Sequence, residues 1–472
     1  MRMGQSIFTI ADIIVEPYKF NKILDFKIVR ELNEHARLYI EGIVPEEKMD
    51  QYIENSSEDE IIKVSLKCKE KNIVLFYGIV TSMSLHAKMN VRSIQIEALS
   101  LSFLMDIEKK KCSFQNENAT YKEIFDQITC GYPDSQALDE ASNGKTTGGL
   151  LVQYLETDWE FAKRLASHFN AALIPSCNVN GVKYYIGKVD VPPEHDLKEY
   201  NYIIKKDIKD YLRKSQNGID GIQEKNLISY EITSPDILEL GRPISFKNRK
   251  LYILSSVTEA HDGIILNTYI LKDGEGIKYN RIYNDQLVGV SLFGKVIDVA
   301  KDTVKVHLEI DEKQPVGEAM WFPYSTVYSS PDGSGWYCMP EKGDKVRLYF
   351  PDADEKKAFA ASSVNLTSED PQKRSDPAVK SISTKYGKHI VFKPGAIEIM
   401  SNGNQLVRLT DDGGIEISTD KKLTISAKED IEINSGTKIL VQGDEGIELI
   451  QSTANLTIAD DVSMNGAKVN IE

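Results

Sequence analysis

The most regular feature of this chain is an eight-residue alternation of apolar and polar positions between residues 407 and 449. Each repeat places two apolar residues at positions i and i+2, and residues two apart lie on one face of a β-strand. The residues that follow, such as S-T-D-K or N-S-G-T, have the chemistry of turns. Each repeat therefore predicts one short strand and one turn. The six pairs are Val407/Leu409, Ile415/Ile417, Leu423/Ile425, Ile431/Ile433, Ile439/Val441 and Ile447/Leu449.

A single chain with this pattern has no means of covering its own apolar pairs. Eight residues are too few to enclose an interior, and ordering them costs more conformational entropy than burying two side chains recovers. If three identical chains wind around one axis, the pairs meet at the centre and each strand finds partners on other chains. We therefore predict that residues 382–472 form a trimeric triple-stranded β-helix with these twelve residues as its core. A disordered acidic tail is the alternative.

The first part of the chain has the alternation of β-strands, interrupted by two helix signals. Thr120 with Glu123, and Thr157 with Glu160, form capping-box patterns ahead of apolar stripes, which predicts a helix after each. Residues 1–285 are therefore expected to form a β-rich region with few helices. The predicted strands cover residues 23–30, 36–44, 61–66, 73–80, 91–99, 172–175, 182–186, 228–232, 251–257 and 263–271.

From residue 288 the sequence pattern changes to one typical of short strands joined by tight turns. Five or six strands in under eighty residues predict a small barrel of the oligonucleotide/oligosaccharide-binding (OB) type over residues 286–365. Residues 366–381 contain two prolines and dense charge, which is typical of a linker. The fold class is thus mainly β. The six barrel segments are FGKVIDV, DTVKVHLEI, EAMWFP, GWYCMP, GDKVRLYF and AFAASSVN.

Length, charge and cysteine content narrow the class of protein. A chain of 472 residues predicts two to four domains. The formal net charge of −14 argues against nucleic acid as a partner, because phosphate binding needs a basic face. Five scattered cysteines favour reduced thiols over disulfides or a zinc site. The N-terminus lacks the pattern of a signal peptide, so we expect synthesis in the cytoplasm.

The acidic cluster Glu156, Asp158 and Glu160 is the strongest candidate for acid–base chemistry. Asp158 and Glu160 are, however, placed to stabilise a helix N-terminus whose cap is Thr157, and capping is the favoured interpretation. His168, toward the end of that helix, is expected at the surface or facing the helix dipole. The seven histidines occur singly, without metal-binding spacing. We therefore predict no catalytic, cofactor-binding or metal-binding residues, no cofactor and no enzymatic activity.

Two tryptophans, Trp321 and Trp336, flank a loop of the predicted barrel. Exposed, they could stack on sugar rings, whereas packing in the aromatic core is the favoured interpretation. A spike or fibre that binds or hydrolyses cell-wall glycan is therefore the alternative function.

Four segments, in this order along the chain, resemble one family of proteins. They are LFYGIVTSMS (75–84), QYLETDWEFAKRLASHFNAALIP (153–175), MPEKGDKVRLYFPDADEKKAFAASSVN (339–365) and KYGKHIVF (385–392). They resemble the VgrG-type spike proteins of type VI secretion and the hub-and-needle proteins of contractile phage baseplates. The resemblance includes the pair Arg164 and Leu165 within the second segment.

The resemblance implies a hub of two β-barrel-like modules that trimerises into a ring of quasi-sixfold symmetry. Such a hub adapts a sixfold tail tube to a threefold needle, which sheath contraction drives through a target envelope. The implied partners are two further copies of the chain, a tail tube or tube-adaptor protein, baseplate wedge proteins and the envelope. The implied location is an assembled particle, delivered outside the cell on firing. Phage, tailocin and secretion-system versions all fit.

Two departures from the family pattern matter. Some relatives carry a lysozyme domain between barrel and needle, whereas here residues 366–381 alone separate the two. Some needles end in a His-x-His iron site, but the last seventy residues contain no histidine. A metal tip within this chain is therefore not expected, and a separate tip protein of the PAAR (proline-alanine-alanine-arginine) type is a further candidate partner.

Overall fold

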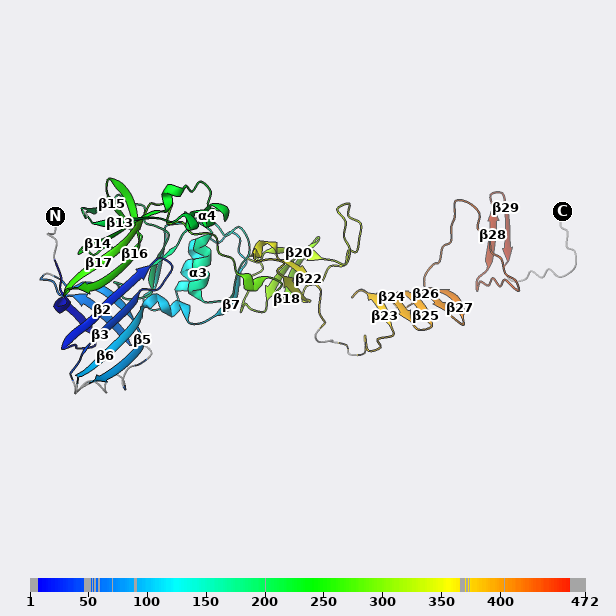
Figure 1. Cartoon of the computed structure of the whole chain (residues 1–472). Helices are drawn as coiled ribbons and strands as arrows, with labels where there is room; N and C mark the ends of the chain where they lie inside the picture. Colours follow the sequence, from blue (N-terminus) through cyan, green and yellow to red (C-terminus); the bar gives the residue numbers. More distant parts are fainter. Residues whose placement is uncertain are drawn as a thin grey trace. The chain divides into compact units, whose positions relative to one another are not determined.

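The computed structural model describes residues 7–45, 52, 54, 57, 60–69, 71–88, 91–199, 201–365, 370, 372, 374–402 and 404–458. The chain divides into two compact units, Met1–Leu366 and Thr367–Glu472. Strands dominate the described residues and helices are few, which confirms the predicted mainly β class (Figure 1). The last part of the predicted needle, from residue 459 onward, lies outside the described residues.

The first unit is built on one large sheet of twelve strands. Its order is β1-β4-β5-β6-β3-β2-β16-β17-β14-β13, with β15 paired to β16 and β12 to β15. Strands β2 and β16 join the two halves of the sheet as antiparallel neighbours. The bounds are β1 (Ile13–Glu16), β2 (Lys22–Glu31), β3 (Arg37–Ile43), β4 (Ile61–Leu66), β5 (Ile73–Lys88), β6 (Val91–Ser100), β12 (Asp196–Leu197), β13 (Tyr202–Lys206), β14 (Ile228–Ser234), β15 (Pro243–Phe246), β16 (Arg249–His261) and β17 (Ile264–Lys272).

Alternating burial explains why these segments form strands. In β3, Leu38 and Ile40 are buried while Tyr39 between them is only partly covered. Phe26 and Ile28 on β2 are buried on the same pattern and belong to the same hydrophobic cluster. All five strands predicted in the first hundred residues are confirmed, although β5 runs eight residues farther than expected.

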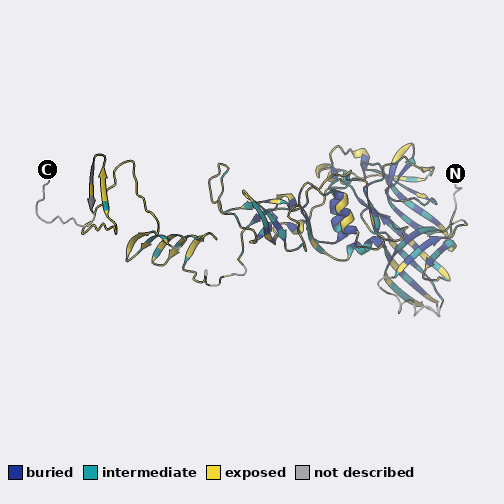
Figure 2. Ribbon diagram, turned by 180° about the vertical axis from the view of Figure 1, so that it is seen from behind, coloured by how far each residue is buried: buried dark blue, intermediate teal, exposed yellow. Residues whose placement is uncertain are grey.

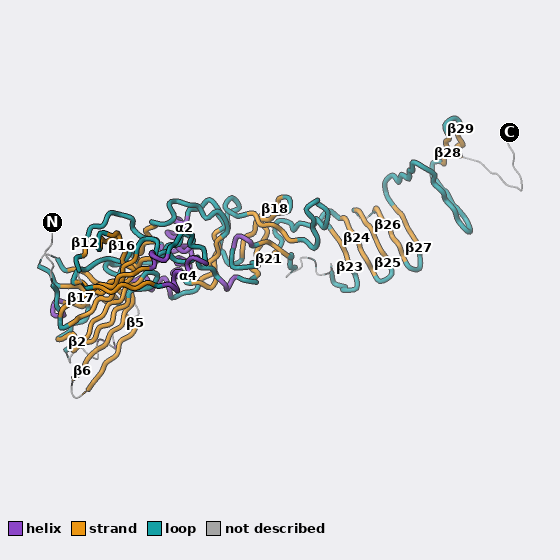
Figure 3. Tube along the Cα trace, turned by 45° about the horizontal axis from the view of Figure 1, so that its top comes forward, coloured by secondary structure: helices purple, strands orange, loops and turns teal. Residues whose placement is uncertain are grey.

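The helices of the first unit lie between the large sheet and the barrel that follows (Figures 1 and 3). Both predicted capping boxes are present: the Thr120 hydroxyl accepts from the Glu123 amide at 3.2 Å, and the Glu123 carboxylate accepts from the Thr120 amide at 2.7 Å. Helix α4 was not predicted. The bounds are α2 (Tyr121–Thr129), α3 (Asp158–Ser167) and α4 (Ile208–Gln216), with short strands β7 (Lys110–Phe114), β8 (Gln136–Asp139), β9 (Leu151–Glu156), β10 (Leu173–Pro175) and β11 (Lys183–Ile186).

Five strands form a closed barrel in the order β18-β19-β20-β22-β21, as the OB-type pattern predicts. A further strand predicted over residues 335–340 is wrong. That segment belongs to an exposed loop, in which Gly335 has a φ of +138° and Pro340 follows closely. The barrel strands are β18 (Ser291–Ala300), β19 (Thr303–Leu308), β20 (Trp321–Ser325), β21 (Lys345–Tyr349) and β22 (Phe359–Ala361).

The second unit contains an antiparallel meander and a separate hairpin. The meander comprises β23 (Lys380–Ser383), β24 (Lys388–Lys393), β25 (Ala396–Ser401), β26 (Gln405–Thr410) and β27 (Gly414–Ser418), and the hairpin comprises β28 (Ile447–Gln451) and β29 (Ala454–Ile458). Residues 419–446 carry no strand, so the expectation of one strand in each repeat is wrong for the pairs Leu423/Ile425, Ile431/Ile433 and Ile439/Val441. Figure 2 shows this unit to be largely exposed, in contrast to the buried sheet of the first.

The first two apolar pairs of the repeat form strands that pair with each other inside one chain. Val407 lies opposite Ile417, and Leu409 lies opposite Ile415. The expectation that each repeat strand finds its partners on other chains is therefore wrong for β26 and β27. The physical reason is the turn between them, where Gly414 adopts a φ of +80° that suits glycine.

We expect Thr120→Ala to lower the free energy of unfolding by about 0.5–2 kcal/mol, because it removes the hydroxyl that caps α2. Urea denaturation followed by circular dichroism measures the change. Thr120→Ser keeps a capping hydroxyl and should stay close to the wild type. Equal loss in both variants would contradict the capping role.

Candidate functional site: the hub–barrel junction and the apolar face

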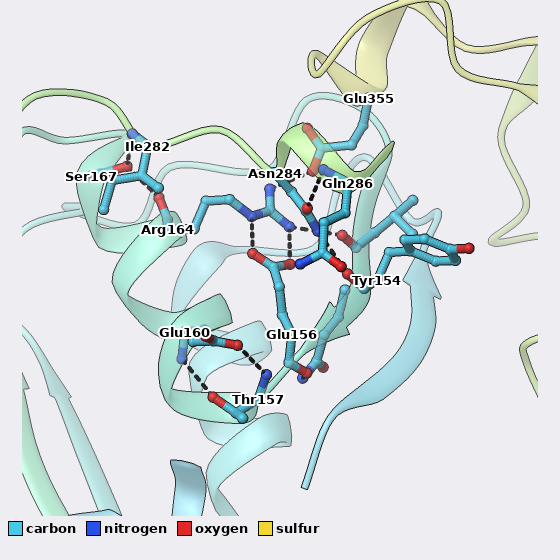
Figure 4. A network of polar contacts seen from close by, with 12 residues as sticks. Tyr154, Glu156, Thr157, Glu160, Arg164, Ser167, Ile282, Asn284, Gln286 and Glu355 are labelled. Atoms are coloured by element: carbon cyan, nitrogen blue, oxygen red, sulfur yellow. Dashed lines mark hydrogen bonds and ion pairs between the residues drawn. The ribbon is translucent and has the colours of Figure 1, made fainter. Parts of the chain in front are cut away.

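Arg164 on helix α3 connects the part of the first unit that precedes the barrel to the barrel itself (Figure 4). Its side chain is 1% exposed. Nε and Nη2 donate to the two carboxylate oxygens of Glu156, at 2.7 and 2.8 Å, and Nη2 also donates to the Val152 carbonyl at 2.7 Å. Nη1 donates to Glu355, which lies in the turn between β21 and β22 of the barrel. We call Arg164, Glu156 and Glu355 the junction.

The Arg164 guanidinium stays charged in the junction although it is buried. Burial opposes the charge of Arg164, but hydrogen bonds and Coulombic attraction from Glu156 and Glu355 outweigh it and raise the pKa of the guanidinium. Losing one partner of such a group leaves an uncompensated buried charge, which costs about 3–5 kcal/mol. The junction therefore fixes the barrel on α3 and β9.

Further contacts surround the junction and extend the same attachment. Asp311 of the barrel accepts from the Ser113 amide at 2.7 Å and from its hydroxyl at 2.6 Å. The Gln115 side-chain amide donates to the Val306 carbonyl at 3.0 Å. Leu150 and Val152 belong to the hydrophobic cluster of the barrel. The barrel is therefore packed on the preceding domain along a broad face.

The acidic cluster singled out by the sequence serves structure in this chain. Thr157 and Glu160 form the expected capping box, with bonds of 3.1 and 2.9 Å. Asp158 is 1% exposed and accepts from Lys110 at 2.6 Å, Tyr132 at 2.6 Å and Gln153 at 2.9 Å. Glu156 is held in the junction. All three carboxylates are thus committed to partners within the fold.

Of the two expectations for His168, the surface position is wrong, whereas its place as the C-cap residue of α3 puts it at the C-terminal end of that helix. The side chain is partly buried, and its Nδ1 lies 2.8 Å from the Tyr121 hydroxyl. Burial, together with the positive charges of Arg281 and Arg164, lowers the pKa of His168 to about 3. The imidazole is therefore neutral in the folded protein at neutral pH. Packing of α3 against α2 places it there, which the local sequence pattern does not reveal.

The favoured interpretation of the two tryptophans, packing in the aromatic core, is also wrong. Trp321 is 38% exposed and Trp336 is 56% exposed. The Lys305 ammonium lies 5.1 Å from the Trp321 ring centroid, a cation–π distance. Among the described residues, no group of three or more His, Cys, Asp and Glu side chains is placed to hold a metal ion.

The meander of the second unit has one apolar face and one polar face. On the polar face, Glu398 accepts from Lys393 at 2.6 Å and from Arg408 at 3.1 Å, and Arg408 also pairs with Glu416 at 3.1 Å. On the other face, directly opposed residues are apolar across four strands. We call this the apolar face: Ile390, Phe392, Ile397, Ile399, Val407, Leu409, Ile415 and Ile417.

Among the described residues, the side chains of the apolar face are largely exposed. Ile415 is 72% exposed and Ile417 is 57% exposed. The later repeat residues share this exposure, between 52% and 71% for Leu423, Ile425, Ile431, Ile433, Ile439 and Val441, and 58% for Leu449. The role of these residues as a trimer core stays a prediction. Apolar patches of this size mark interaction surfaces in soluble proteins.

Four residues of the apolar face escaped the sequence analysis: Ile390, Phe392, Ile397 and Ile399. They also form apolar pairs at i and i+2, but their pairs stand seven and ten residues from the next pair instead of eight. A search for such pairs with variable turn lengths would have found them.

Comparison with solved structures shows what this fold is similar to. The E. coli c3393 protein, described as a type VI secretion component with structural similarity to the T4 phage tail proteins gp27 and gp5, is 13% identical with a TM-score of 0.54. The match covers 75% of this chain and 99% of that one. A chain of the half-lidded Francisella PdpA–VgrG complex is 11% identical with a TM-score of 0.55, over 86% of this chain and 87% of that one.

The lidded form of the same Francisella complex gives a third match, at 11% identity and a TM-score of 0.53 over 84% of this chain and 76% of that one. No family model and no curated protein sequence matches the chain. The chain therefore has the fold of VgrG-like spike proteins, at a sequence identity that shows the fold alone. No helix among the described residues is long and apolar enough to cross a membrane.

We expect Arg164→Met to lower the free energy of unfolding of the first unit by about 3–5 kcal/mol, because Glu156 and Glu355 would stay buried without their cation. Urea unfolding followed by tryptophan fluorescence measures it. Arg37→Met, which removes an exposed ion pair with Glu31, should cost at most about 1 kcal/mol. Similar effects of the two substitutions would contradict the role of the junction.

A pH titration of stability tests the burial of His168. The unfolded imidazole takes up a proton as pH falls below its ordinary pKa of 6.5, whereas the folded one resists protonation until about pH 3. The wild type should therefore lose stability between these values, and His168→Gln should lose less. Urea unfolding at a series of pH values compares the slopes. Parallel slopes would show that His168 titrates alike in both states.

Proposed function

We propose that the chain is the homotrimeric central hub-spike of a contractile injection machine, of phage, tailocin or type VI-like origin. The observation that carries this proposal is the apolar face together with the exposed apolar pairs that follow it. In support, similarity to the spike-protein fold extends over most of the chain.

The proposed trimer rests on the positions of the apolar side chains along the repeat. Repeat residues on one strand face need cover along the whole segment, and a second copy of the same segment offers the matching period. Three copies around one axis bring the pairs together at the centre while the turns and charged residues stay in water. We propose that this arrangement begins at the meander and continues as a triple-stranded β-helix through the later repeats.

We assign four parts to the chain by the same reasoning. Residues 1–285 form the hub, 286–365 the OB-type barrel, 366–381 a linker and 382–472 the needle. The hub trimer would meet a sixfold tail tube or tube-adaptor protein, with baseplate wedge proteins around it and a PAAR-like protein at the tip. Sheath contraction would then drive the needle through the target envelope.

The proposed function is mechanical and not enzymatic. It is supported by the carboxylates around α3, which are bound to partners within the fold, and by the structural role of the junction. The exposed Trp321 and Trp336 leave glycan binding by the barrel as the second candidate. Turbidity loss of a peptidoglycan suspension, or glycan binding abolished by Trp336→Ala, would favour that candidate.

We expect the full chain to sediment with three times the mass of one chain, and Ile425→Asp to weaken the trimer. Threefold symmetry would place three carboxylates at one level of the axis, out of water. Sedimentation velocity in a dilution series measures the trimer fraction.

Thr424→Asp is the matched control, because in the proposed β-helix residue 424 faces away from the axis, so the same charge would lie in water. It should leave the trimer fraction unchanged. A folded wild-type protein that sediments as a monomer would overturn the proposal.

A further inference from the structure

Arg30 on β2 is a buried cation without an anionic partner. The residue is 9% exposed and faces the same side of the sheet as Phe26 and Ile28, the core side. Among the described residues it makes no ion pair, and its Nε is buried without a hydrogen-bond partner. Ser256 lies directly opposite Arg30 on β16, and its hydroxyl is likewise buried without a partner. Two orphaned polar groups therefore stand side by side.

The Arg30 side chain hydrogen-bonds two neutral groups, the Cys177 thiol and the Tyr269 hydroxyl. Burial raises the pKa of the Cys177 thiol, and it raises the pKa of the Tyr269 hydroxyl to about 12. Arg30 lowers both pKa values only in part. Neither group therefore supplies a negative charge at neutral pH. A buried guanidinium among neutral partners lacks the counter-charge that usually accompanies a buried cation.

Arg30 lines a cavity of about 320 Å³, together with residues of strands β8, β10 and β11. This volume falls within the range of small-molecule sites, about 300–1,000 Å³. Two more cations line the cavity, Lys183 and Arg242. Its one lining carboxylate, Glu239, is exposed and already pairs with Arg242 at 3.1 Å. The cavity therefore has an excess of positive charge around room for a ligand.

We propose that this cavity binds a small oxyanion, phosphate or a phosphate monoester, through the Arg30 guanidinium with Lys183 at its rim. A planar guanidinium matches two oxygens of such an anion in a bidentate geometry, and the bond is charge-assisted. The anion would offset the positive charge that Arg30, Lys183 and Arg242 bring to the cavity. Binding at this place is independent of the needle and of the trimer, and the proposal stands apart from the mechanical function.

Isothermal titration of the full chain with inorganic phosphate, at constant ionic strength maintained with chloride, tests the site. We expect saturable binding of one phosphate per chain in the wild type. Arg30→Gln should weaken it by at least about tenfold, because a charge-assisted hydrogen bond is lost. Arg37→Gln removes an exposed arginine from neighbouring strand β3 and should leave the affinity unchanged. Absence of saturable binding, or equal affinity in Arg30→Gln, overturns the proposal.

Two further measurements keep the test sharp if Arg30→Gln does not fold. Lys183→Gln alters a partly exposed residue of the cavity and should weaken phosphate binding several-fold, whereas unchanged affinity counts against the site. In thermal unfolding, phosphate should raise the midpoint of the wild type more than that of Arg30→Met. A purely structural Arg30 would give the same phosphate response in both proteins.

Discussion

Apolar side chains left in water by a single chain are the constraint on which this molecule depends. The apolar face presents isoleucine, leucine, valine and phenylalanine in register across four strands. Exposing each of these side chains to water costs free energy, and the cost falls when apolar surfaces pack together. The polar face of the same meander is already satisfied by its own ion pairs around Glu398. The two faces therefore differ: the polar one is satisfied within the meander, whereas the apolar one is exposed among the described residues.

The first unit solves a different problem, the attachment of a small barrel to a large sheet. Helix α3 begins with a capping box and carries Arg164 on its buried side. That arginine reaches Glu156 at the end of β9 and Glu355 inside the barrel, so one side chain connects three elements. The large sheet and the barrel thereby belong to one compact unit.

Sequence patterns predicted the parts of this structure that are local. Alternating residues gave the early strands, and Thr120 and Thr157 marked their helices because a cap and its partner stand three residues apart. The closed barrel followed from five short strands separated by turns. The loop at residues 335–340 was misread as a strand because aromatic residues suggested β-structure, while glycine and proline around them favoured a turn.

Contacts between segments distant along the chain could not be predicted from the sequence, for a physical reason. The partial burial of His168, the partners of Arg164 and the isolation of Arg30 are set by segments distant along the chain, so no local period records them. The apolar face was half predicted. Its eight-residue pairs were found, whereas Ile390, Phe392, Ile397 and Ile399 were missed because their turns vary in length.

The depth of the junction also determines how it responds to its surroundings. Dissolved ions screen charges across about 8 Å at physiological ionic strength, but they act on pairs that water can reach. Arg164 and Glu355 are 1% and 3% exposed, whereas Arg408 and Glu416 on the meander are 39% and 53% exposed. Raising the ionic strength therefore weakens the ion pairs of the meander and leaves the junction intact.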